Sequence, residues 1–192
     1  MEEQPIDRAA RPVTPAREGS VTMSGSESSS PTALIAQLAS TNPDERAEAA
    51  ELLCRAGTEA VAAMLPLVTA CGDNDSRVRE WAVAALEELG PPPAEIIDHL
   101  AEIATGPEPL GAYWATTLLG RAGGDAAAAV PALATCVASA KDMAVRERAA
   151  WALGKIGPAA LSAREALQQA VAGGKDSRLA RLATEALAAI GS

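Results

Sequence analysis

Apolar residues recur at helical spacing in five stretches of the chain, and each stretch ends at a glycine. The five glycines, Gly57, Gly90, Gly123, Gly157 and Gly191, are 33, 33, 34 and 34 residues apart. A leucine stands four residues before each glycine and an alanine eight before, as at Leu153 and Ala149. Offsets of one, four, five, eight and twelve lie on one side of an α-helix, so each unit is predicted to contain an amphipathic helix with glycine as its C-cap.

A second helix is predicted in each unit, because a leucine also stands ten residues after the first four glycines. The leucines and the prolines that mark the turn into this helix are Leu67, Leu100, Leu133, Leu167, Pro66, Pro91 to Pro93, Pro131 and Pro158. N-cap residues in TNPDE at 41, DNDS at 73, KDM at 141 and KDS at 175 mark the starts of the first helices. Asp75 and Asp142 precede Arg79 and Arg146 by four residues, and we expect each pair to meet across one helical turn.

The predicted fold is all-α: a right-handed α-solenoid, or armadillo-like superhelix, of about ten helices. The expected repeats are at about 41–72, 73–106, 107–139 and 140–174, with a partial repeat at 175–192 and an unpaired helix at 31–40. No single helical pair buries its apolar stripe alone, so neighbouring units are expected to stack into one continuous core.

Residues 1–30 have a different composition, rich in Ser, Pro, Gly and mixed charge with few apolar residues. We expect a disordered N-terminal tail, because such a segment buries too little surface to offset its ordering entropy. Met23 stands directly before the predicted ordered part and is an alternative start of the natural protein.

The segment DMAVRERAAWALGKIG at 142–157 closely resembles the HEAT-repeat pattern, in the variant known from phycobilisome-lyase-type HEAT-like repeats. The segment DNDSRVREWAVAALEELG at 73–90 is similar. The third unit departs, with Gly111 and Ala112 where the pattern has Val and Arg, and we expect a softer joint there. The resemblance spans about residues 31–191 and implies the fold, whereas repeats of this type serve as binding scaffolds in many unrelated settings.

Composition narrows the possible classes of function. The chain is 48% hydrophobic but only 2% aromatic and contains no Phe, so Ala, Leu, Val and Ile must fill the core. A net charge of −9 argues against nucleic acid as a partner. No uninterrupted apolar run reaches about 18 residues and no secretory leader is evident, so we expect no membrane span and a cytoplasmic location. The alanine-rich usage suggests a bacterial source of high genomic GC content.

Candidate catalytic and metal-binding groups are few. His99 is the only histidine, which removes most His-based triads and metal sites, including the His-Glu pairs of iron-binding HEAT-repeat hydroxylases. Cys54, Cys71 and Cys136 form no CxxC pair and are expected to be free, mostly buried thiols. We therefore expect no catalytic residue, no metal and no cofactor, and a protein that is not an enzyme.

Polar side chains on the second helices form the candidate partner-binding site. In HEAT repeats these helices usually line the concave face, where helical phase places Glu95, Asp98 and Glu102, with His99 at the flank, and Glu165 and Gln169. Ala128, Ala132 and Thr135 of the unit between them would form a floor of small residues. This acidic strip is suited to a basic segment of a protein partner, and the alternative is that its charges serve only solubility.

Three tryptophans are further candidates for contacts. Trp81 and Trp114 occupy equivalent places nine residues before a glycine and are expected to lie near each other across one repeat interface, with Tyr113 beside the latter. They are either core packing or a binding hot spot. Trp151 points further outward by its phase and is the better candidate for a contact residue.

The leading functional hypothesis is a non-enzymatic protein–protein interaction scaffold with a partly acidic concave face. One alternative, suggested only by the repeat subtype, is a bilin lyase-like protein or lyase chaperone. Nucleic-acid binding is the weakest alternative, because no basic stripe is evident in the sequence. The partner and the oligomeric state are left open.

Overall fold

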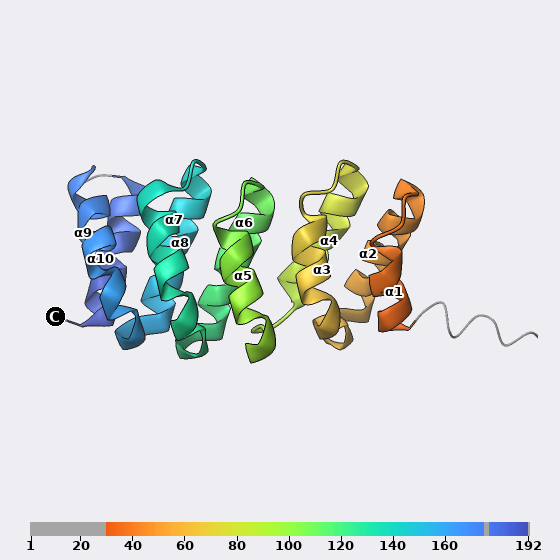
Figure 1. Cartoon of the computed structure of the whole chain (residues 1–192), viewed down its shortest axis with the longest axis horizontal. Coiled ribbons are helices and arrows are strands. Elements are labelled where there is room, and N and C mark those ends of the chain that lie inside the picture. The colour runs from red at the N-terminus through yellow and green to blue at the C-terminus, as the bar shows by residue number, and fades with distance from the viewer. Residues whose placement is uncertain (1–29, 175–176, 192) are drawn as a thin grey trace, which may run out of the picture.

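The computed structural model describes residues 30–174 and 177–191, and the predicted tail at 1–30 lies outside them except for Ser30. These residues form an all-helical stack along one long axis (Figure 1). The α-helices are α1 (Pro31–Gln37), α2 (Pro43–Ala56), α3 (Met64–Ala70), α4 (Ser76–Glu88), α5 (Ile97–Ala104), α6 (Pro109–Ala122), α7 (Val130–Ser139), α8 (Met143–Ile156), α9 (Arg164–Ala172) and α10 (Arg178–Ile190). The 3₁₀ segments are η1 (Gly57–Ala63), η2 (Ala94–Ile96), η3 (Gly123–Ala129) and η4 (Gly157–Ala163).

The helices form two layers. The first-helix layer contains α2, α4, α6, α8 and α10, and the second-helix layer contains α1, α3, α5, α7 and α9 (Figure 1). Each second-layer helix packs against the first-layer helix that follows it in the chain. The predicted all-α solenoid of stacked helix pairs is therefore confirmed.

Positive-φ glycines separate the two helices of most units. Gly57, Gly123 and Gly157 have φ of 55°, 58° and 70°, which residues with a Cβ rarely adopt. At each one the chain continues directly as a seven-residue 3₁₀ segment and then a short α-helix, rather than as one α-helix. Counted as continuous runs, the described residues hold seven helices, and ten when the runs are divided at these glycines.

Gly90 departs from this pattern, and the prediction of a positive-φ cap there is wrong. It is not among the glycines with positive φ, and the C-cap of α4, Leu89, is extended with ψ of 139°. Pro91 to Pro93 follow, and because proline restricts the preceding residue to extended conformations, the chain crosses to η2 without a glycine reversal.

The predicted register of the core is confirmed. Leu53, Leu86, Leu119 and Leu153 are all fully buried, as are the alanines four residues before them. Leu187, the fifth leucine of the series, is only partly buried, because α10 is the last helix of the described stack and no further unit covers it.

Two helical runs, Pro43–Ala70 and Pro109–Ser139, are long and apolar enough to cross a membrane by length and composition alone. Each run contains a positive-φ glycine, Gly57 or Gly123, and its parts pack against neighbouring units. They are thus the apolar helices of a stacked repeat, and the cytoplasmic location stays a prediction.

The predicted contacts between cap aspartates and arginines are wrong. The carboxylates of Asp75 and Asp142 instead accept hydrogen bonds from main-chain N–H groups of their own helices, α4 and α8. Arg79 donates to the carbonyl oxygen of Asp73 and Arg146 to that of Val137, at 2.6 and 2.8 Å. Arg79 thus bonds to the turn that precedes α4 and Arg146 to the last turn of α7, because unpaired main-chain carbonyls there attract an arginine more strongly than the occupied cap does.

Arg46 makes the most extensive of these contacts. Its guanidinium forms two hydrogen bonds with the Asp73 carboxylate, Nε to Oδ2 at 2.7 Å and Nη2 to Oδ1 at 2.9 Å, and donates to Ser40 O at 2.9 Å. Both side chains are mostly buried. The hydrogen bonds from Arg46 hold the pKa of Asp73 below its usual value, with the main-chain N–H of Asp75 adding to the effect.

We expect Asp73→Asn to lower stability at pH 7 and to make stability less dependent on pH below about 5. A carboxyl group with a lowered pKa in the folded state stabilises the protein above its unfolded pKa of about 3.9, and this contribution is lost as pH falls through the folded pKa. Urea denaturation at pH 7, 5, 4 and 3 should therefore show the difference between wild type and variant shrinking toward low pH. Asp125→Asn, at an exposed position, is the control. A difference equal at pH 3 and pH 7 would refute this role of Asp73.

The third unit joins the stack differently from the others. Glu108 caps α6, its carboxylate accepting hydrogen bonds from the N–H groups of Leu110 and Gly111. A Cβ at Gly111 would lie 3.2 Å from Val68 O, so the glycine allows α6 to approach α3 closely. Indeed, α6 contacts α3 more extensively than it contacts α4. Arg121 bridges α6 to α4, donating to the carbonyls at the end of α4. The softness expected of this joint stays a prediction.

Candidate partner-binding surfaces

Three exposed carboxylates form a row along η2 and α5. Glu95, Asp98 and Glu102 are three and four residues apart, which places them on one side of the helix, and His99 is exposed beside them. The ion pairs found in the described part of the chain involve other carboxylates. This acidic row (Glu95, Asp98 and Glu102) therefore faces solvent without an internal cation.

The remaining predicted site residues lie on other helices. Glu165 and Gln169 are exposed on α9, where Gln169 Nε2 donates to Glu165 Oε1 at 3.2 Å. They share the second-helix layer with the acidic row, but α7 lies between α5 and α9. Trp151 belongs to α8 in the first-helix layer. The structure thus divides the predicted site into an acidic row, a polar pair two helices away and an aromatic residue in the other layer.

The distribution of charge along the solenoid is strongly uneven. Residues 31–106 contain thirteen Asp and Glu against four Lys and Arg, whereas residues 107–192 contain seven against nine. The net charge of −9 therefore hides an acidic N-terminal part that ends with α5 and a weakly basic C-terminal part. The sequence already contains this difference in charge between the two parts, which the net charge of the whole chain conceals.

An aromatic and cationic cluster surrounds Trp151. The Arg148 guanidinium lies over the rings of Tyr113 and Trp151, with its Cζ 4.7 and 5.0 Å from their centroids, and it donates to the Tyr113 hydroxyl. Lys155 also lies near the Trp151 ring, with its Nζ 5.8 Å from the ring centroid. Trp151 packs over Gly120 of α6 and is only partly exposed. In the sequence, the feature that indicates this contact is a glycine, Gly120, inside a predicted helix.

The expected proximity of Trp81 and Trp114 is not seen. Among the described aromatic residues, the ring contact is between Tyr113 and Trp114, edge to face with centroids 6.0 Å apart. Trp114 is 6% exposed and belongs to the core, with the Arg121 guanidinium over its ring. Trp114 is therefore a packing residue.

The thiols are protonated, largely buried groups. Burial raises the pKa of Cys71 to about 12 and that of Cys136 to about 11, and it also raises the pKa of the partly buried Cys54. The thiolate is the nucleophilic form, so a raised pKa makes these thiols poor nucleophiles. Within residues 30–174 and 177–191, no group of three or more His, Cys, Asp or Glu side chains is arranged to hold a metal ion.

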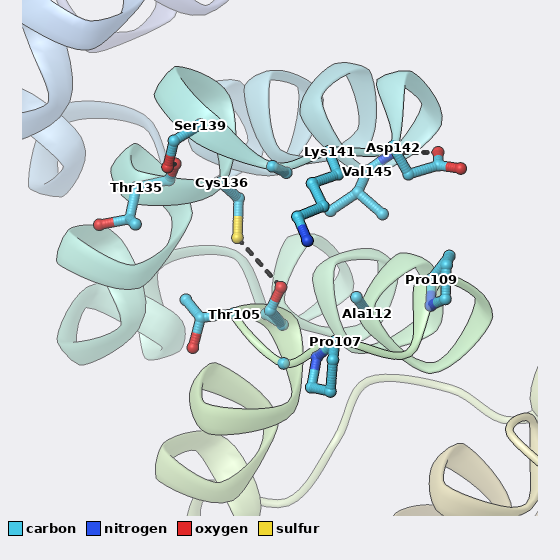
Figure 2. Close-up of a pocket in the computed structure, with 13 residues that line it drawn as sticks. Thr105, Pro107, Pro109, Ala112, Thr135, Cys136, Ser139, Lys141, Asp142 and Val145 are labelled. Atoms are coloured by element: carbon cyan, nitrogen blue, oxygen red, sulfur yellow. Dashed lines mark hydrogen bonds between the residues drawn. The ribbon is translucent and has the colours of Figure 1, made fainter.

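A pocket of about 390 Å³ opens where the ends of α5 and α7 meet (Figure 2). One wall consists of Thr105, Gly106 and Pro107 after α5, and the opposite wall consists of Thr135, Cys136 and Ser139 of α7. The Cys136 thiol donates to the carbonyl oxygen of Ala104 at 3.2 Å. The Lys141 side chain extends into this α5–α7 pocket (Figure 2). The period of a single helix does not predict this pocket, because its two walls come from successive units and meet only when those units stack.

The stacked helix pairs define an α-solenoid. Folds of this type typically serve as protein-interaction scaffolds. The sequence model for HEAT repeats matches residues 31–105 and 97–188. The chain therefore belongs to the HEAT-repeat family. No curated protein matches the sequence.

Several solved structures share the fold of this chain at low sequence identity. An engineered protein shares 24% identity with a TM-score of 0.57, covering 82% of this chain and 77% of its own. A designed armadillo repeat protein in complex with the peptide (KR)4 shares 16% identity with a TM-score of 0.59, covering 86% and 83%. The CpcE–CpcF complex of phycocyanin lyase from Nostoc sp. PCC7120 shares 19% with a TM-score of 0.53, covering 81% and 96%. At these identities the likeness shows the fold alone.

Proposed function

We propose that this HEAT-repeat protein is a non-enzymatic interaction scaffold that binds a basic segment of a protein partner along α5. The observation that carries the proposal is the acidic row itself, three exposed carboxylates on one side of η2 and α5 without an internal cation. The row stands in the part of the chain where acidic residues outnumber basic ones thirteen to four, so the surrounding potential also attracts a cationic partner.

The spacing of the row suits an extended peptide. Seven residues of helix advance roughly 10 Å, so neighbouring carboxylates are about 5 to 6 Å apart along the axis. Alternate side chains of an extended segment are roughly 6.6 Å apart, so successive Lys or Arg side chains on one face of a peptide would each meet a carboxylate. Glu165 and Gln169, two helices away, would extend this surface for a longer segment, and His99 would flank it.

The solved complex of a designed armadillo repeat protein with (KR)4 supports the proposal at the level of architecture, because a helical solenoid of this type holds a fully basic peptide there. The lyase alternative rests on the fold shared with the CpcE–CpcF complex, and the thiols of this chain, with their raised pKa values, do not favour it.

We expect the triple variant Glu95→Gln/Asp98→Asn/Glu102→Gln to bind a fluorescent (KR)4 peptide about tenfold more weakly than wild type, from three partly solvated charge contacts of about 0.5 kcal/mol each. Fluorescence anisotropy titrations at several salt concentrations measure this, and the triple variant should also show a weaker dependence of affinity on salt. Circular dichroism is expected to show unchanged helix content, because all three side chains are exposed.

The control is Glu59→Gln/Asp125→Asn/Glu185→Gln, which removes the same charge from exposed positions on other elements. It should retain most of the affinity. Equal losses of affinity in the two triple variants would mean that binding depends only on the net charge of the protein. Unchanged affinity in the α5 variant would exclude the acidic row as the site.

A further inference from the structure

One position in the repeat distinguishes the third unit from its neighbours. Eleven residues before the unit glycine stand, in chain order, Arg46, Arg79, Ala112, Arg146 and Ala180. All three arginines are only partly exposed. Arg46 and Arg79 donate to the main-chain carbonyl six residues earlier, in the turn before their own helix, and Arg146 donates to the carbonyl of Val137 in the last turn of α7. The architecture therefore provides a position for a guanidinium group at the start of a unit, and three units fill it with their own side chain.

The third unit has no arginine at this position. Ala112 stands at the place of Arg46, and Ala140 stands at the place of Asp73, the carboxylate that pairs with Arg46 between the first two units. Both alanines line the α5–α7 pocket. The pocket of about 390 Å³ thus lies where the first interface holds a buried Arg–Asp pair.

The surroundings of the pocket favour a cation. The C-terminal ends of α5 and α7 both border it, and helix C-termini carry partial negative charge on their unpaired carbonyls. The carbonyl of Gly106 has the same register as those of Ser40 and Asp73, which accept hydrogen bonds from Arg46 and Arg79. The chain directs its own cation, Lys141, into the pocket, and Lys141 forms no ion pair with any described carboxylate (Figure 2).

We infer that the α5–α7 pocket is a binding slot for an arginine side chain of the partner's basic segment. The choice of partner rests on the proposed function. Glu102, the last carboxylate of the acidic row, stands three residues before Thr105 at the pocket wall, one turn along the same helix end. A segment lying on the acidic row would therefore reach the pocket with its next side chain. The arginine would take the place of the exposed Lys141 ammonium.

The first test fills the slot from within. Ala112→Arg restores the residue that three other units carry at this position, so it should retain the fold and leave the melting temperature unchanged or raised. We expect its affinity for (KR)4 to fall about tenfold relative to wild type, equivalent to about 1.4 kcal/mol. Ala188→Arg, which adds the same charge at an exposed position of α10 in the first-helix layer, should change the affinity by less than about twofold.

The second test separates arginine from lysine without the acidic row. In NMR titrations, N-acetylarginine amide is expected to shift the amide signals of Gly106 and Ala140 in wild type and not in Ala112→Arg, while N-acetyllysine amide shifts them less. Lys141→Ala should strengthen the binding of the arginine compound severalfold, because a competing cation is removed.

The outcomes separate the two proposals. If (KR)4 binding depends on the acidic row but not on residue 112, and the arginine compound causes no shifts, the slot is wrong and the proposed function stands. If the arginine compound binds in the pocket but the triple variant of the acidic row binds (KR)4 as tightly as wild type, the slot stands and the acidic row is wrong. Weaker binding of the arginine compound in Lys141→Ala would show that Lys141 does not compete for the pocket, which would overturn the inference.

Discussion

Replacing Leu119 by alanine is expected to lower the free energy of unfolding by about 2–5 kcal/mol, the range for a fully buried leucine in a core that relaxes only partly. Leu119 of α6 is 0% exposed and belongs to the leucine series of the core. Each unit is stabilised mainly by its neighbours, so a cavity in the third unit weakens contacts on both sides. Urea denaturation followed by circular dichroism measures the loss.

The matched control is Leu161→Ala, which makes the same chemical change in η4 at a leucine that is 56% exposed. Its effect should stay within about 0.5 kcal/mol, as for most surface substitutions. Similar losses in the two variants would mean that the register of the core around α6 is wrong.

Gly120→Ala is expected to destabilise the protein by roughly 1–3 kcal/mol through overpacking between α6 and α8. A Cβ at this position would lie 2.8 Å from Cε3 of Trp151 and 3.1 Å from Cα of Ala152. Alanine favours a helix over glycine by up to about 1 kcal/mol, but here the clash outweighs this gain, because the backbone of α8 cannot move away as a flexible side chain would. Thermal and urea denaturation measure the result.

A double-mutant cycle separates this clash from a loss of helix geometry. Adding Trp151→Leu to Gly120→Ala removes the ring that the new Cβ meets, so the double variant should be less destabilised than the sum of the two single changes. Gly124→Ala, where no neighbouring atom lies within 4 Å of the added Cβ, is the control. Strict additivity of the two changes would refute the packing of Trp151 on Gly120.

The spacing of small residues and leucines predicted the repeat and its core because burial in a helix follows a local period. The same reasoning placed Glu95, Asp98 and Glu102 together, since they stand on one helix. It failed for Gly90, where three prolines impose an extended path, and for the arginines at 79 and 146. There a nearby aspartate suggested an ion pair, but that carboxylate caps the helix, and the arginine bonds instead to a main-chain carbonyl six or nine residues earlier, which the residue types alone do not indicate.

The sequence by itself determined the repeating unit, its buried leucines and alanines, and the glycines at which most units reverse, because all of these depend on residues within a few helical turns. Only the tertiary structure decided what lies between units. It brought Tyr113 to Arg148 and Gly120 to Trp151, and it opened a pocket between Ala112 and Ala140 where Arg46 and Asp73 pair in the first interface. The physical reason is that partners roughly 30 residues apart meet only when one repeat packs on the next, and the local period that defines each helix carries no information about that contact.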